Sequence, residues 1–191
     1  MSVICEPTAI PDVCLFTPQV HGDARGFFLQ TYQTIEYAAA GLDRVFVQDN
    51  LSRSRRDTVR GLHYQLRHPQ AKLVSVMRGA VLDVAVDIRR GSPTFGTFVV
   101  AELSEENRHQ LYIPEGFAHG FRVLSESADF FYKCTDHYAP GDEYGVRWND
   151  PALAIPWGDL STPVVSTKDQ QLPRLADVPP DTLPEFKRKE A

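Results

Sequence analysis

The sequence is poor in cysteine, has no long apolar run and carries no excess of basic residues. Its three cysteines, Cys5, Cys14 and Cys134, lack paired spacing, which argues against a disulfide framework and indicates reduced thiols in a cytoplasmic protein. No run is long enough to span a bilayer, and residues 1–7 do not resemble a signal peptide. The net charge of −5 and pI near 5.7 disfavour a general nucleic-acid or membrane-surface binder. An anionic ligand would need a local basic pocket.

The remaining composition is that of an ordinary globular domain. The chain has 191 residues, of which 42% are hydrophobic and 24% charged, and a chain of this size buries roughly 70% of its unfolded surface. We expect one domain over residues 1–191. Its last part, 176–191, is rich in proline and charge and is expected to be loosely ordered or packed on the surface.

Short β-strands separated by glycine and proline dominate the pattern. Between positions 82 and 88, aliphatic residues alternate with Asp83 and Asp87, as in a strand with two different faces. The acidic face would point either to solvent or, in a small barrel, into a ligand cavity. About ten such strands with little helix predict an all-β sandwich or barrel.

Helix is expected at only a few places. Residues 34–40 form one predicted helix, and a second is expected to begin at 166–169. Residues 52–57 are polar and basic and are predicted to form a loop before the segment that carries His63.

A glycine-rich turn at 21–28 predicts a β-hairpin. Arg25 and Phe27 lie on it. They are either ordinary hairpin residues or an exposed cation–aromatic pair suited to a phosphate beside a flat ring.

Two histidines, His63 and His119, each follow a glycine-containing turn onto a strand, which resembles the cupin double-stranded β-helix, or jelly roll. Metal-binding cupins have a His-x-His motif, whereas His63 is followed here by Tyr64 and Gln65. Two histidines are too few for a stable transition-metal site, which takes three or four ligands. We therefore expect no metal, and a metal-dependent oxygenase is disfavoured.

Several blocks of sequence, in order along the chain, resemble the dTDP-4-dehydrorhamnose 3,5-epimerase family. They are VRGLHYQ (59–65), KLV (72–74), DVAVDIR (83–89), SPTFG (92–96), IPEGFAHGF (113–121) and YK (132–133). The similarity runs from about residue 10 to residue 175, and this many ordered blocks are very specific to the family. One departure is Gln30, where many relatives have Glu, which removes a charge at that position.

The resemblance implies an isomerase without metal or cofactor. It would invert C3 and C5 of dTDP-4-dehydro-6-deoxy-D-glucose through an enolate, giving dTDP-4-dehydro-β-L-rhamnose. A reductase would then complete dTDP-L-rhamnose for cell-surface polysaccharide such as lipopolysaccharide O-antigen.

Catalytic roles follow from the resemblance. It implies that His63 is the base, Asp169 its carboxylate partner, Lys72 the stabiliser of the enolate oxygen and Tyr132 the acid on the opposite face. Without the resemblance, these residues would be interpreted as a structural histidine, a helix-cap acid, a solvated lysine and a core tyrosine. As a separate hypothesis, Asp83 holds Lys72.

Substrate-binding residues carry over in the same way. The resemblance implies Arg25, Arg60 and Lys168 for the diphosphate, Phe27 and Tyr138 stacked on thymine, Gln48, Asn50 and Glu143 as polar contacts, and His119 at the sugar. It also implies a homodimer, in which the segment around Arg25 and Phe27 reaches the neighbouring subunit's site.

Three other functions remain open. An epimerase acting at C3 alone would use the same residues. An isomerase that moves the keto group between C3 and C4 would not need Tyr132 as acid. A non-catalytic sugar-nucleotide binding module would be expected to lose the base or the acid, and both are present in this sequence.

Overall fold

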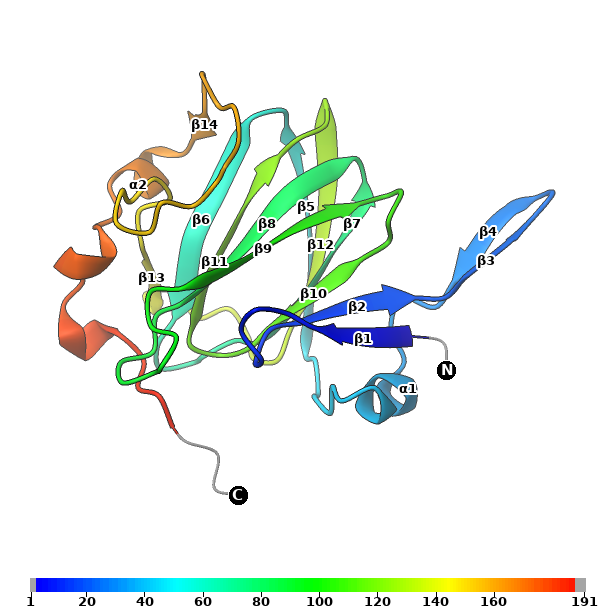
Figure 1. Cartoon of the computed structure of the whole chain (residues 1–191), viewed down its shortest axis with the longest axis horizontal. Coiled ribbons are helices and arrows are strands. Elements are labelled where there is room, and N and C mark those ends of the chain that lie inside the picture. The colour runs from blue at the N-terminus through cyan, green and yellow to red at the C-terminus, as the bar shows by residue number, and fades with distance from the viewer. Residues whose placement is uncertain (1–2, 188–191) are drawn as a thin grey trace.

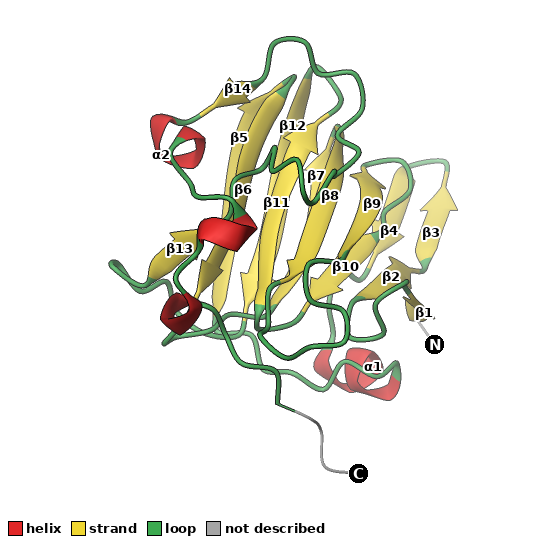
Figure 2. Ribbon diagram, turned by 60° about the vertical axis from the view of Figure 1, so that its left-hand side comes forward, coloured by secondary structure: helices red, strands yellow, loops and turns green. Residues whose placement is uncertain are grey.

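The computed structural model describes residues 3–187 and is built from two facing β-sheets (Figure 1 and Figure 2). The first has the order β1 (Val3–Pro7), β2 (Cys14–Pro18), β10 (Gln110–Ile113), β7 (Lys72–Arg78), β12 (Ser127–Cys134), β5 (Gln48–Arg55). The second has the order β13 (Glu143–Gly145), β6 (Thr58–Gln65), β11 (Phe117–Val123), β8 (Ala80–Asp87), β9 (Phe98–Ser104), with β14 (Val164–Val165) also beside β6. The predicted all-β, cupin-type barrel is confirmed.

Helices are few and short. They are α1 (Thr34–Ala39), α2 (Thr167–Gln170) and two 3-10 turns, Leu175–Asp177 and Pro180–Thr182. Both predicted helices are therefore confirmed, and Ser166 caps α2 by accepting a hydrogen bond from the Asp169 backbone N–H at 3.1 Å. Within residues 3–187, no helix is long and apolar enough to cross a membrane.

The loop predicted at 52–57 is wrong. Strand β5 continues to Arg55, and a turn then leads into β6, which starts at Thr58. This part of the strand was missed because neither of its faces is apolar: β5 lies at the edge of its sheet, and its partly buried face is polar. Strand prediction depends on apolar alternation, which such a strand does not have.

Strand β8 is buried on both faces. Val84 and Val86, and Ile88 just after the strand, pack outward against the C-terminal part of the chain. Asp83 and Asp87 lie on the opposite face and are fully buried. The acidic face therefore points into the protein rather than to solvent.

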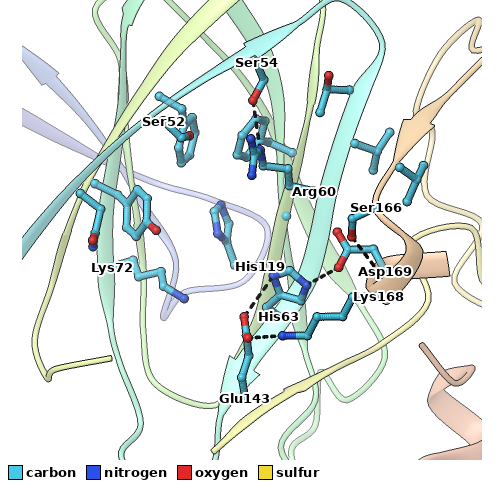
Figure 3. A pocket seen from close by; sticks show the side chains of 18 of the residues that line it. Ser52, Ser54, Arg60, His63, Lys72, His119, Glu143, Ser166, Lys168 and Asp169 are labelled. Carbon is cyan, nitrogen blue, oxygen red and sulfur yellow. Dashed lines mark hydrogen bonds and ion pairs between the residues drawn. The ribbon is translucent and has the colours of Figure 1, made fainter. Parts of the chain in front are cut away.

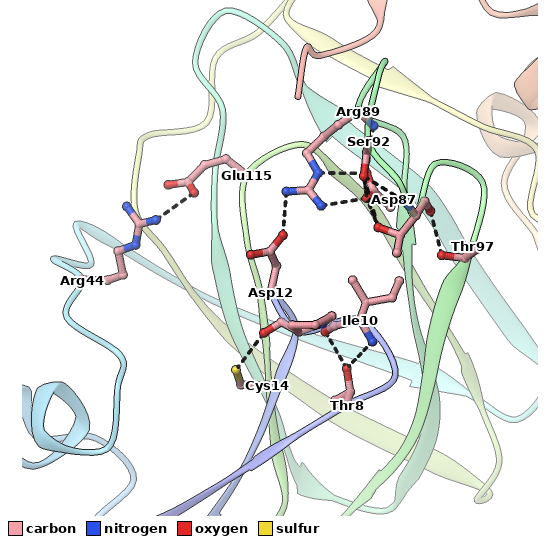
Figure 4. Close-up of polar contacts among 12 residues, drawn as sticks. Thr8, Ile10, Asp12, Cys14, Arg44, Asp87, Arg89, Ser92, Thr97 and Glu115 are labelled. Atoms are coloured by element: carbon pink, nitrogen blue, oxygen red, sulfur yellow. Dashed lines mark hydrogen bonds and ion pairs between the residues drawn. The ribbon is translucent and has the colours of Figure 1, made fainter. Parts of the chain in front are cut away.

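Asp87 neutralises Arg89, a largely buried arginine at one end of the barrel (Figure 4). Its carboxylate accepts hydrogen bonds from Arg89 Nη2 at 2.7 Å and from Ser92 Oγ and Thr94 Oγ1 at 2.6 Å. Arg89 also bonds Asp12 at 2.9 Å. Burial alone would raise the pKa of Asp87, but these donors outweigh it and hold the pKa below its ordinary value. The sequence blocks at 83–89 and 92–96 thus form a hydrogen-bonded network that holds this end of the barrel together, in addition to supplying Asp83.

The C-terminal part of the chain covers the outer face of the second sheet (Figure 2). Trp157, Leu175, Val178 and Leu183 are buried there in one cluster with residues of β6, β8 and β11. The stretch 176–187 of the predicted tail is packed on the barrel by these contacts. The remainder of that tail, 188–191, lies outside the described residues. This cover also brings α2 to the open end of the barrel.

Candidate active site

A cavity of about 850 Å³ lies between the sheets, bordered by β5, β6, β12 and α2 (Figure 3). All four predicted catalytic residues line it: His63, Lys72, Tyr132 and Asp169. So do most of the predicted binding residues: Gln48, Asn50, Arg60, His119, Tyr138, Glu143 and Lys168. Arg25 and Phe27 do not.

His63 is held by a buried carboxylate. Its Nε2 lies 2.7 Å from Asp169 Oδ1, and the Asp169 side chain is only 5% exposed. The second oxygen, Oδ2, accepts a hydrogen bond from the Gly61 backbone N–H at 3.2 Å. Burial alone would raise the pKa of Asp169, but the contacts with His63 and Gly61 outweigh it and keep the pKa low. An ionised Asp169 requires the imidazole proton on Nε2, which leaves the Nδ1 lone pair available.

A second carboxylate lies on the Nδ1 side of His63. Glu143 Oε1 is 3.6 Å from Nδ1, and Glu143 Oε2 forms an ion pair with Lys168 (Figure 3). The hydrogen bond to Glu143 raises the pKa of Lys168. Tyr138 also reaches this group, with its hydroxyl 3.5 Å from Glu143 Oε2. Glu143 therefore links the histidine to the groups at the mouth of the cavity.

His119 lies directly opposite His63 on the neighbouring strand β11. Its Nε2 is 2.9 Å from Asp83 Oδ2, and Asp83 is fully buried. We had expected Asp83 to hold Lys72. That expectation is wrong, because Asp83 bonds His119 instead. Strand β8 pairs directly with β11, which brings the two side chains together.

Lys72 and Tyr132 enter the cavity from the first sheet. Burial lowers the pKa of Lys72, an effect that outweighs the nearby carboxylates of Glu143 and Asp83. Burial also raises the pKa of Tyr132, so its phenol keeps its proton at neutral pH. Among the described residues, no carboxylate lies within 4.0 Å of the Lys72 ammonium, which leaves it available to an oxygen of a ligand.

A row of polar side chains on β5 forms the wall beside Arg60. Gln48, Asn50, Ser52 and Ser54 alternate along the strand and all line the cavity. Arg60 Nε donates a hydrogen bond to Ser54 Oγ at 3.0 Å, which orients its guanidinium. The two serines were not predicted as site residues, although the period of two in 48–54 is visible in the sequence.

The cavity is basic, although the chain carries a net charge of −5. Its lining includes Arg53, Arg55, Arg60, Lys72 and Lys168, but only Glu143 and Asp169 as carboxylates. Such a pocket favours an anionic ligand. No group of three or more His, Cys, Asp or Glu side chains within residues 3–187 is arranged to hold a metal ion.

Arg25 and Phe27 lie on a hairpin that projects away from the barrel (Figure 1). The hairpin is formed by β3 (Val20–Asp23) and β4 (Gly26–Leu29), as predicted. Phe27 is 57% exposed, with the Arg108 guanidinium 4.3 Å from its ring centre. The Arg25 side chain is 90% exposed and pairs with Asp23 at 2.5 Å. Neither residue reaches the cavity of its own chain.

Comparison with known proteins identifies the family to which the chain is similar. The sequence model of the family described as dTDP-4-dehydrorhamnose 3,5-epimerase matches residues 7–177. The dTDP-4-dehydrorhamnose 3,5-epimerase of Pseudomonas aeruginosa is 55% identical over 170 residues, which are 88% of this chain and 94% of that protein. A dTDP-4-dehydrorhamnose 3-epimerase of Streptomyces niveus is 42% identical over 173 residues, 90% of this chain and 83% of that protein.

A crystal structure of an epimerase is also similar to this chain. It is the dTDP-6-deoxy-D-glucose-3,5-epimerase of Legionella pneumophila in complex with dTDP-4-keto-L-rhamnose, which superposes with a TM-score of 0.95 at 46% identity. The match covers 97% of this chain and 100% of that chain. The chain therefore belongs to the dTDP-4-dehydrorhamnose 3,5-epimerase family.

Proposed function

We propose that the protein inverts C3 and C5 of dTDP-4-dehydro-6-deoxy-D-glucose to give dTDP-4-dehydro-β-L-rhamnose. The observation that carries this proposal is the grouping of His63–Asp169, Lys72 and Tyr132 around one basic cavity. A base, a cation and a phenol acid are the groups that proton transfer next to a ketone requires. The product would be an intermediate of dTDP-L-rhamnose synthesis.

His63 acts as the base in this proposal. Its Nδ1 removes the proton from a carbon beside the C4 ketone, and the electrons of that C–H bond move onto the ketone oxygen to give an enolate. Asp169 keeps the imidazole in the required tautomer and stabilises the imidazolium that forms. The 2.7 Å contact and the low exposure of Asp169 support this role.

Lys72 and Tyr132 complete each inversion. The Lys72 ammonium lies next to the enolate oxygen and stabilises its negative charge, an effect that is strong in a site shielded from water. Tyr132 donates its proton to the carbon from the side opposite His63, which inverts the centre. The two residues enter from the sheet opposite His63, which supports this division of roles.

The nucleotide binds along the mouth of the cavity. Arg60 and Lys168 contact the diphosphate, since both are cations of the lining and Arg60 is oriented by Ser54. Tyr138 is 52% exposed at the edge, where it stacks on the thymine, with Gln48, Asn50 and Glu143 as polar contacts. His119, held by Asp83, contacts the sugar.

An epimerase specific for C3 is the second candidate, because one relative of that name is 42% identical. Relatives named as 3,5-epimerases reach 55% identity, which favours the two-centre reaction.

The protein acts as a cytoplasmic homodimer in this proposal, with the β3–β4 hairpin reaching the partner's cavity. The support is the exposure of Arg25 and Phe27 away from their own site. A large exposed aromatic beside an exposed cation is suited to a ligand or a partner surface.

The decisive experiment follows C3 and C5 by NMR while the protein turns over the 4-keto sugar nucleotide in deuterated water. Deuterium at both carbons with inverted configuration supports the 3,5-epimerase, and deuterium at C3 alone supports the one-centre enzyme. No exchange at either carbon would leave only a binding protein.

A further inference from the structure

The cavity contains a carboxylate that the reaction above uses only for binding. Glu143 Oε1 lies 3.6 Å from His63 Nδ1, the nitrogen that receives the substrate proton. The Glu143 side chain is 21% exposed, whereas that of Asp169 is 5% exposed. Of the two acids beside the base, Glu143 is therefore the one with access to solvent.

Proton counting shows why such a group is needed. In each inversion, a C–H bond breaks and its proton forms an N–H bond at His63 Nδ1. A new C–H bond then forms with the proton of Tyr132. After one inversion, His63 is an imidazolium and Tyr132 a phenolate, so neither can act again until a proton has left one and another has reached the other.

The imidazolium of His63 cannot pass its extra proton to solvent through its other nitrogen, Nε2. Nε2 faces Asp169, which is buried and also bonded by the Gly61 N–H. A proton placed on Asp169 would remain inside the protein. The Nδ1 side, by contrast, leads to Glu143, Lys168 and the mouth of the cavity (Figure 3). At 3.6 Å, a small movement or one bridging water is enough for transfer.

We propose that Glu143 is the proton-relay residue that resets His63 between inversions. The N–H bond at Nδ1 breaks, the proton forms an O–H bond on Glu143 Oε1, and Glu143 then gives it to water. The Tyr132 phenolate takes one proton from water, so that no net proton is consumed. This inference rests on the proposed epimerase function and matters most for a substrate with two centres to invert.

The competing explanation is that Glu143 only positions Lys168 for the diphosphate, because the two form an ion pair. Lys168→Gln breaks the same ion pair but retains the carboxylate, so it is the matched control for Glu143→Gln. If Glu143 only positioned Lys168, both variants would show the same defect, a raised KM with an unchanged ratio between the rates of the first and the later inversions.

The test is rapid-quench kinetics in deuterated water at saturating substrate, with deuterium at C3 and C5 measured by mass spectrometry. For Glu143→Gln we expect every inversion after the first, including the second one within the first turnover, to slow by roughly 100-fold relative to the first inversion, the lower end for loss of a general acid–base group. Added formate, a small carboxylate, should speed these later inversions. Lys168→Gln should show neither the change in ratio nor the rescue.

The inference is overturned if Glu143→Gln slows the first inversion as much as the later inversions, or if formate does not speed the later inversions of this variant. Glu143→Asp, which keeps a carboxylate, is the second variant, and its later inversions should be slowed less than those of Glu143→Gln. An equal loss in Glu143→Asp and Glu143→Gln would also contradict the relay. A wild-type protein that installs no deuterium would instead overturn the proposed function itself.

Discussion

His63 and His119 are direct partners on the antiparallel strands β6 and β11, and each imidazole contacts a buried carboxylate through Nε2. Their carboxylates have different origins: Asp83 comes from the adjacent strand β8, whereas Asp169 comes from the distant helix α2. Of these two histidines, only His63 has a second acid of the described part of the chain, Glu143, beside its other nitrogen. This difference supports the roles proposed above, in which His63 transfers protons and His119 contacts the sugar.

Replacing Asp169 by Asn should leave the shape of the site but remove its charge. The amide can present its NH2 group to His63 Nε2, which favours the tautomer with the proton on Nδ1 and removes the lone pair that the base needs. We expect kcat to fall by roughly 10²- to 10⁴-fold, with a much smaller change in KM. Steady-state kinetics of the epimerisation measure both, and a kcat close to that of the wild type would contradict the role of Asp169.

Tyr132→Phe should separate proton removal from inversion. His63 and Lys72 can still form the enolate, but the acid on the opposite face is missing. We expect deuterium from the solvent to enter the substrate with retained configuration at the centre that Tyr132 protonates, while epimerised product falls by about 10²-fold or more. NMR of the recovered sugar nucleotide distinguishes deuterium exchange with retained configuration from inversion. Inversion at the wild-type rate would exclude Tyr132 as the acid.

Activity should decline at alkaline pH as Lys72 loses its charge. Burial lowers the pKa of Lys72 and raises the pKa of Tyr132, so burial brings the loss of charge on the lysine to lower pH and moves the ionisation of the tyrosine to higher pH. Lys72→Arg keeps its charge to higher pH, and its alkaline decline should move upward even if its maximal rate is lower. Profiles of kcat/KM against pH test this. If the alkaline decline of kcat/KM occurred at the same pH in Lys72→Arg as in the wild type, the decline would come from another group.

Asp169 should also stabilise the fold in a pH-dependent way. Its pKa in the folded protein lies below its ordinary value of 3.8, so its contribution is present above about that pH. The contribution is lost as the pH falls through the folded-state value. The free energy of unfolding of Asp169→Asn should therefore differ from that of the wild type at neutral pH and approach it in acid. Denaturant unfolding across this range measures the difference, and a constant gap would contradict the assignment.

If Arg25 of one subunit completes the cavity of its partner in a homodimer, two variants that are each inactive should restore activity when they are mixed. In a mixed dimer of Arg25→Ala and His63→Ala subunits, one site combines an intact His63 with the partner's intact arginine. Random mixing should therefore restore about a quarter of the wild-type sites. Activity of refolded mixtures tests this, and a mixture no more active than its components would place Arg25 outside the neighbouring cavity.

The sequence predicts the barrel because alternation is strong in strands such as β8, and the family blocks identify the residues at the cavity. It does not predict the second half of strand β5, whose polar face lines the cavity and therefore lacks apolar residues. It also does not predict the partner of Asp83, because that depends on the pairing of β8 with β11 rather than on sequence distance. The positions of Arg25 and Phe27 outside their own cavity likewise follow from the direction in which a hairpin projects.

The origin of Asp169 in the C-terminal cover has a consequence for how the enzyme matures. During synthesis, the ribosome releases every strand from β1 to β13, with His63, Lys72 and Tyr132, before α2. A nascent barrel would thus hold a histidine whose imidazole is not yet oriented. Activity would begin only when the cover docks through Trp157, Leu175 and Leu183. Proteolytic cleavage between β13 and α2 would reverse this step if the C-terminal part then dissociated. Catalytic activity therefore depends on a chain that is complete through α2.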